Sequence, residues 1–223
     1  MIMLKDSIHG SFCYSGNMAA PITHILFALQ LNEKCTNDFI LGVSFPDIRY
    51  LGVISREATH SLTLKNIVDS ESFTSGMAFH QYIDHRRREY WHEKDIYNRL
   101  PASPYISHAL KFLEDVILYD RIEDWSSIGK MFKYIPEEEQ EFAVPLDASK
   151  RWHKLLSDYI VYGPSFESIY KLTDDLDPSG KITSGLQELM PLLVKDEELK
   201  NAINHFYDEM NKALLTLSLS KYS

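Results

Sequence analysis

Five side chains of the kinds that bind transition metals occur in the first part of the chain. They are His24, Asp47, His60, His80 and Asp84. His80 and Asp84 are four positions apart, and a helix of 3.6 residues per turn places such a pair on one face, one turn apart. Imidazole nitrogens together with carboxylate oxygens suit zinc, manganese or iron, whereas thiolates would indicate structural zinc and oxygen ligands alone calcium or magnesium. The residue types therefore predict a transition-metal site.

His80 and Asp84 also fit a simpler interpretation, an ion pair at helical spacing that stabilises a helix by only ~0.2–0.5 kcal/mol. The surrounding sequence favours the metal, because the same helical stripe carries Phe73, Met77 and Trp91. A charge among such large apolar side chains is costly to bury without compensation. A cation shared with the other histidine and aspartate residues would provide that compensation.

His24 and Asp47 are weaker candidates when each is taken alone. His24 lies in an apolar stretch, where a histidine is as readily a core residue as a ligand. Asp47 follows an apolar run that ends at Pro46, and its alternative role is to cap a helix or a turn.

The helices that must position these residues can be predicted from the spacing of apolar residues, and their ends from proline and glycine residues. The expected helices cover residues 21–31, 37–45, 73–94, 103–121, 124–134, 147–162, 165–172, 181–194 and 196–218. We expect the second helix to end before Pro46 and residues 49–61 to form a loop that carries His60 near its end. No segment alternates apolar and polar residues for long, and valine is scarce, so the fold class is predicted to be all-α.

Length and composition indicate one soluble globular domain. The chain has 223 residues, of which 44% are hydrophobic and 25% charged, as in ordinary globular proteins. We expect an irregular lead-in at residues 1–17 and a single helical domain at 18–223. Two cysteines exclude a disulfide framework and suit a reducing compartment, and no apolar run is long enough to span a membrane. A cytoplasmic protein is predicted.

The charge distribution argues against binding to duplex nucleic acid. The formal net charge is −9, and residues 101–223 hold 13 lysines and arginines against 21 acidic residues. A duplex-binding surface needs a clustered basic face. Residues 124–223 carry no pattern that indicates a function, and the ligand-type residues all lie before them.

Residues 20–95 carry a series of short motifs in a recognisable order. These are Thr23-His24, Leu41-Gly42 followed by Pro46-Asp47, Thr59-His60, and His80-x-x-x-Asp84. In this order and context they resemble the zinc-dependent phospholipase C family and its relatives of the P1 nuclease fold. The resemblance implies that Asp47, His60, His80 and Asp84 bind one metal ion and that His24 shares Asp84 with a second ion.

The family's N-terminal tryptophan and its later His-x-x-x-Glu pair are absent, since Phe112 stands four positions after His108. His108 and Asp115, seven positions apart on one helix face, are candidates for replacing that pair. Two other helical phosphoesterase groups are looser comparisons: the acyl carrier protein phosphodiesterases, and the HD superfamily, whose adjacent His-Asp dipeptide is missing here.

The resemblance implies a metal-dependent hydrolase that cleaves a phosphoester, either a phosphodiester or a phospholipid-like substrate, through a metal-bound hydroxide. Zn²⁺ is the expected cofactor, with Mn²⁺ or Fe²⁺ as alternatives. The other function that fits the sequence is a non-catalytic helical binding protein with a structural metal site.

Several polar residues outside the ligand set also have predicted roles. Arg49 and Arg56 lie between two ligand candidates and are placed to reach a substrate phosphate, so Arg56, together with Asp84, is predicted to be catalytic. The run Arg86-Arg87-Arg88 and the acidic residues 137–141 are expected to be solvated. His153 has no companion that the sequence identifies.

Overall fold

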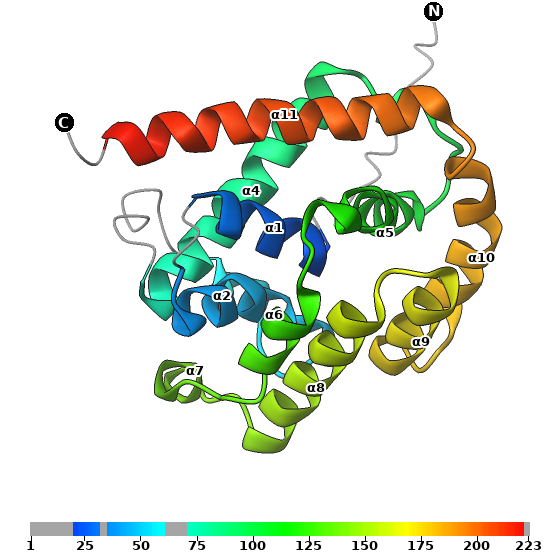
Figure 1. Ribbon diagram of the computed structural model, residues 1–223. Coiled ribbons are helices and arrows are strands. Elements are labelled where there is room, and N and C mark those ends of the chain that lie inside the picture. The colour runs from blue at the N-terminus through cyan, green and yellow to red at the C-terminus, as the bar shows by residue number, and fades with distance from the viewer. Residues whose placement is uncertain (1–19, 32–34, 61–70, 221–223) are drawn as a thin grey trace, which may run out of the picture.

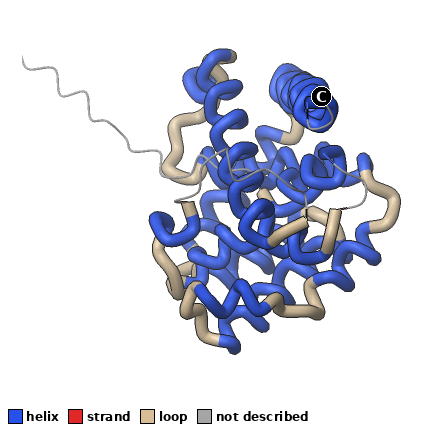
Figure 2. The backbone as a smooth tube through the Cα atoms, turned by 90° about the vertical axis from the view of Figure 1, so that its left-hand side faces the viewer, coloured by secondary structure: helices blue, strands red, loops and turns tan. Residues whose placement is uncertain are grey.

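Every regular element in the described residues is helical, which confirms the all-α prediction (Figures 1 and 2). The computed structural model describes residues 20–31, 35–60 and 71–220. The helices are α1 (Pro21–Leu31), α2 (Asn37–Ser44), η1 (Phe45–Leu51), α3 (Arg56–Thr59), α4 (Phe73–Glu93), η3 (Tyr97–Arg99), α5 (Ile106–Leu118), η4 (Tyr119–Arg121), α6 (Trp125–Met131), α7 (Glu137–Glu141), α8 (Leu146–Tyr162), α9 (Phe166–Leu176), α10 (Lys181–Leu193) and α11 (Glu197–Ser220). The expected lead-in at 1–17 lies outside the described residues, so that boundary stays a prediction.

Side-chain caps fix where the helices of the ligand-bearing region begin. The Thr36 hydroxyl accepts a hydrogen bond from the Phe39 backbone N–H at the start of α2, and the Ser72 hydroxyl accepts one from Ser75 at the start of α4. Such caps satisfy N–H groups that have no partner within the helix. The long helix that carries His80 and Asp84 therefore starts where the sequence predicted.

The backbones of α2 and α4 touch, and two glycines make this approach possible. A Cβ atom at Gly42 would lie 2.0 Å from the Phe73 carbonyl oxygen, and one at Gly76 would lie 2.2 Å from the Phe39 carbonyl oxygen. No side chain fits at either position. The close crossing brings the last turn of α2 directly against the turn of α4 that carries His80.

The other helices enclose this pair and α1. In Figure 1, α11 runs across α1 and α5, while α6, α8, α9 and α10 form an arc that returns to α5. Phe27 of α1 packs against Phe206 and Tyr207 of α11, with ring centroids 5.7 and 5.9 Å apart. None of the helices in the described ranges is long and apolar enough to cross a lipid bilayer.

The structure differs from the sequence prediction between Pro46 and His60. α2 ends at Ser44, and Pro46 lies in the first turn of the 3₁₀ helix η1, because a proline ring fits a first helical turn, where no N–H partner is needed. Phe45, directly before Pro46, keeps helical angles (φ −64°, ψ −40°) against the usual tendency at this position. The predicted loop is thus occupied by η1 and the short α3, and Asp47 lies on a helix.

Candidate metal centre

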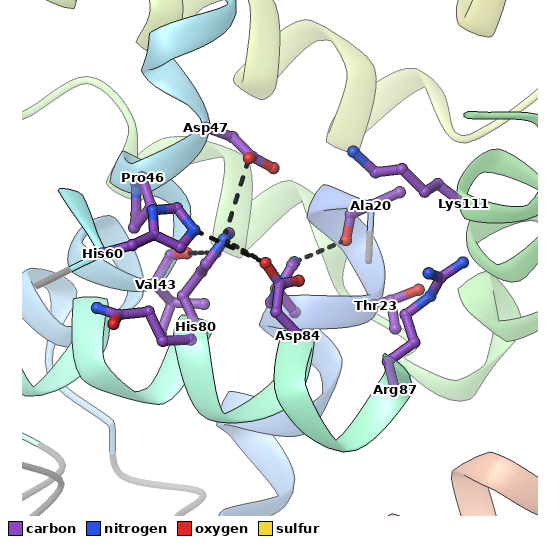
Figure 3. A network of polar contacts seen from close by, with 12 residues as sticks. Ala20, Thr23, Val43, Pro46, Asp47, His60, His80, Asp84, Arg87 and Lys111 are labelled. Atoms are coloured by element: carbon purple, nitrogen blue, oxygen red, sulfur yellow. Dashed lines mark hydrogen bonds and ion pairs between the residues drawn. The ribbon is translucent and has the colours of Figure 1, made fainter. Parts of the chain in front are cut away.

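The five ligand candidates converge in the interior, as the sequence predicted (Figure 3). His24 comes from α1, Asp47 from η1, His60 from the residue after α3, and His80 and Asp84 from α4. Asp84 is the common neighbour: its Oδ1 lies 3.2 Å from His24 Nε2, and its Oδ2 lies 3.5 Å from His80 Nε2 and 3.8 Å from His60 Nε2. Asp47 Oδ1 lies 4.0 Å from His80 Nε2. The ligand set therefore forms one cluster.

The three imidazoles are held by their Nδ1 atoms. His80 Nδ1 donates to the Val43 carbonyl oxygen at 2.8 Å, and His24 Nδ1 donates to the Ala20 carbonyl oxygen at 3.2 Å. Thr59 Oγ1 gives its hydrogen to the Arg56 carbonyl oxygen, so it accepts from His60 Nδ1 at 2.9 Å. A histidine that donates through Nδ1 presents a lone pair at Nε2. Histidines that bind a metal through one ring nitrogen usually donate through the other one in this way.

Two of these Nε2 atoms, those of His60 and His80, are buried and have no hydrogen-bond partner among the described residues. Buried polar atoms without a partner are rare and unfavourable. Two ligand atoms bound to one tetrahedral zinc at about 2.1 Å are about 3.4 Å apart, close to the 3.5 and 3.8 Å that separate these nitrogens from Asp84 Oδ2. The donor set and its spacing fit a transition-metal ion.

Burial and charge act on the pKa values of the cluster in opposite directions. Burial lowers the pKa of His24, and the neighbouring His80 lowers it further. Burial alone would raise the pKa of Asp84, but His80, His24 and His60 hold it well below its usual range. For Asp47, Arg49 and Lys111 outweigh burial and lower the pKa to about 2. Both carboxylates are ionised at neutral pH, as metal ligation requires.

Asp115 positions the helix that carries His24. Its Oδ1 accepts hydrogen bonds from the Thr23 backbone N–H and hydroxyl at 2.8 and 2.9 Å, and its Oδ2 accepts from Ile22 N–H at 3.3 Å and from the Tyr159 hydroxyl at 3.1 Å. A carboxylate at the start of a helix satisfies its unpaired N–H groups and favours its positive end. Both carboxylate oxygens of Asp115 thus accept hydrogen bonds from α1, which argues against its pairing with His108 in a second metal site.

The arginines are placed differently from the sequence prediction. Arg56 is exposed on α3, and its backbone carbonyl accepts from the Thr59 hydroxyl that holds His60; its catalytic role stays a prediction. Arg49 lies against the cluster instead, with Nη1 2.6 Å from Asp47 Oδ1. Arg87 is completely buried rather than solvated, since its Nε donates to both carboxylate oxygens of Glu114 at 2.8 and 2.9 Å.

A buried pair that the sequence did not predict lies away from the cluster. Glu139, in the acidic run expected to be solvated, is 1% exposed. Its Oε2 lies 2.8 Å from His153 Nε2, while His153 Nδ1 faces the Phe132 carbonyl oxygen at 3.2 Å. One glutamate of the run therefore lies inside the domain and is the partner of His153.

Comparisons of the chain with protein-family models, curated proteins and solved structures find no match. The chemistry of this chain is therefore inferred from its own residues. Sequence reasoning also overlooked Tyr50 and Lys111 near Asp47: the charge of Lys111 lowers the pKa of Asp47, and the Lys111 ammonium donates to the Tyr50 hydroxyl at 3.1 Å. The available signal for Lys111 was its place in α5 between Leu110 and Phe112, two large apolar residues.

Proposed function

We propose that this protein is a metal-dependent hydrolase that cleaves phosphoesters. The observation that carries the proposal is the convergence of three histidine Nε2 atoms on two ionised carboxylates, with His60 Nε2 and His80 Nε2 left without a hydrogen-bond partner in the described residues. Two sets of three residues have ligand atoms close enough to share one ion, His24, Asp47 and His80, and His60, His80 and Asp84. A divalent cation held by such a set would lower the pKa of a water molecule and withdraw electron density from a phosphoryl oxygen. Zinc is the first candidate, with manganese and iron next.

The charges around the cluster favour an anionic substrate. The carboxylates of Asp47 and Asp84 are balanced by the cations of Lys111, which is buried, and Arg49, which is partly buried. A divalent ion then leaves two positive charges without a counterion in a poorly solvated region, where electrostatic interactions are strong. A phosphoester supplies negative charge at that place, whereas a neutral ester or amide does not.

Metal content and turnover of matched variants test the proposal. We expect purified wild-type protein to retain a transition metal and to hydrolyse bis(4-nitrophenyl) phosphate or 4-nitrophenyl phosphate with Zn²⁺, Mn²⁺ or Fe²⁺. Losing a residue that only hydrogen-bonds to a metal ligand weakens metal binding roughly 10–100-fold. Asp84→Ala should weaken it by more than this, and turnover should fall as well. His85→Ala is the control, because His85 is exposed, points about 100° away from Asp84 around α4 and pairs with Glu89.

A structural metal site in a non-catalytic helical protein is the second candidate. The burial of His24, His80 and Asp84, each 1% exposed, favours it, because structural sites are closed to solvent. Circular dichroism during chelation separates the two functions. A structural site predicts unfolding on metal removal and no turnover with any metal, whereas the hydrolase loses turnover while its helices remain.

A further inference from the structure

Lys111 is a buried cation whose donors are mostly unused. The residue is 5% exposed, and its ammonium carries three N–H donors. Within the described part of the chain, its hydrogen bonding is limited to the Tyr50 hydroxyl at 3.1 Å, with no carboxylate at ion-pair distance. Leaving buried charged donors without acceptors is unfavourable. The position favours the entry of a further acceptor.

This ammonium lies at the edge of the metal centre. Figure 3 shows it turned toward the Asp47 carboxylate. Tyr50 connects it to Arg49, whose guanidinium donates to Asp47 Oδ1 at 2.6 Å and to the Tyr50 hydroxyl at 3.3 Å. The Lys111 ammonium and the Arg49 guanidinium also lie 5.0 and 4.6 Å from the centroid of the Tyr50 ring. The Tyr50 hydroxyl thus lies between two positive charges.

Two residues on this side of the centre are partly exposed. Tyr50 and His108 are both partly exposed, and His108 lies one turn before Lys111 on α5, on the same helix face. Burial and the Lys111 charge lower the pKa of His108 to about 4. His108 is therefore neutral at pH 7, so the positive charges on this side are those of Lys111 and Arg49.

We propose that Lys111 and Tyr50, supported by the charge of Arg49, form an oxyanion-binding wall that receives the phosphoryl group at the metal centre. The inference deepens the proposed function and rests on it for the identity of the substrate. The Lys111 ammonium donates to a non-bridging phosphoryl oxygen, and the Tyr50 hydroxyl orients that ammonium and offers a second donor. A carboxylic ester offers the ammonium only a neutral carbonyl oxygen, whereas a phosphoester offers a charged acceptor that binds it more strongly, so the wall favours phosphoesters over carboxylic esters.

Binding of inorganic phosphate tests the wall without relying on turnover. Phosphate is titrated calorimetrically into zinc-loaded wild type and the variants Lys111→Met and Tyr50→Phe, and zinc content is measured on the same samples. We expect Lys111→Met to weaken phosphate binding about tenfold or more, because hydrogen bonds to charged groups are the strong ones, and Tyr50→Phe to weaken it about threefold. Lys171→Met is the charge-matched control, since Lys171 is exposed on α9. Methionine has a similar volume, so the core around position 111 should remain folded.

Each result bears on one proposal. If phosphate affinity is the same in Lys111→Met and wild type at equal zinc content, the oxyanion wall is wrong, and the same holds if zinc-loaded wild type binds no phosphate. If wild type binds phosphate through Lys111 but cleaves no phosphoester, the oxyanion wall is supported and the hydrolase proposal is wrong. If wild type takes up no zinc, the metal centre fails, and titration of the metal-free protein still decides whether phosphate binding depends on Lys111.

Discussion

Asp115 illustrates how one buried side chain couples pH to stability. Burial raises its pKa to about 7, although four hydrogen-bond donors act in the opposite direction. A carboxyl group with a raised pKa stabilises the folded state most below its unfolded pKa of about 4, and the contribution is lost as pH rises toward 7. Above pH 7 this group adds no further change.

We therefore predict that Asp115→Asn changes the pH dependence of unfolding. Wild type should lose about 2 kcal/mol of unfolding free energy from this group between pH 5 and pH 7.5, and the variant should lack that loss. Urea denaturation at the two pH values measures the difference. Asp177→Asn serves as a control, because Asp177 lies in a loop and has a lowered rather than a raised pKa. Parallel pH profiles of Asp115→Asn and wild type would contradict the assignment.

The candidate ligands could be identified from sequence, whereas the residues around them could not. His80 and Asp84 share a helix face because the period of the helix is fixed. Arg87, Lys111 and Glu114 are charged residues that a sequence reading assigns to the surface, and all three are buried by helices distant in the chain. Periodicity indicates which residues share a face, but it does not indicate which other helix covers that face.

At the scale of elements, the crossing of α2 and α4 is the contact that the centre depends on most directly. The hydrogen bond between His80 Nδ1 and the Val43 carbonyl oxygen spans this interface. The sequence predicted both helices and placed Gly42 in a family motif. The backbone contact itself depends on the pairing of Gly42 with Phe73 and of Gly76 with Phe39, and single-sequence patterns do not reveal such pairings.

Gly76→Ala should separate the two helices. The added methyl group meets the Phe39 carbonyl oxygen, which cannot move as a flexible side chain would, so we expect a loss of at least about 1–3 kcal/mol in unfolding free energy. Zinc affinity should fall too, because the His80–Val43 bond is stretched. Thr74→Ala on the exposed side of the same helix is the control. Unchanged stability and zinc affinity in Gly76→Ala would show that the crossing tolerates a side chain.

At the scale of the whole molecule, a bound metal would link elements that are far apart in the chain. Its ligands belong to α1, η1, the end of α3, and α4, and an unfolded chain does not hold them together. A ligand that binds only the folded state adds RT ln(1 + [L]/Kd), about 2.7 kcal/mol at one hundred times Kd. We predict that Tm rises with zinc concentration in wild type and stays constant in Asp84→Ala. Differential scanning calorimetry over a zinc series measures this, and a zinc-independent Tm in wild type would contradict a specific site.

The contacts that hold α1 in place also set an order of assembly. All ligand residues leave the ribosome by position 84, but His24 is positioned by Asp115 and Tyr159, and α1 is covered by Phe206. At a synthesis rate of about 5–20 residues per second, Asp115 emerges roughly 2–6 s and Phe206 roughly 6–24 s after Asp84. During that interval the nascent chain carries all five candidate metal ligands, but α1 still lacks its contacts with the later helices. The completed centre is therefore a late product of folding, formed when the C-terminal helix closes over the first one.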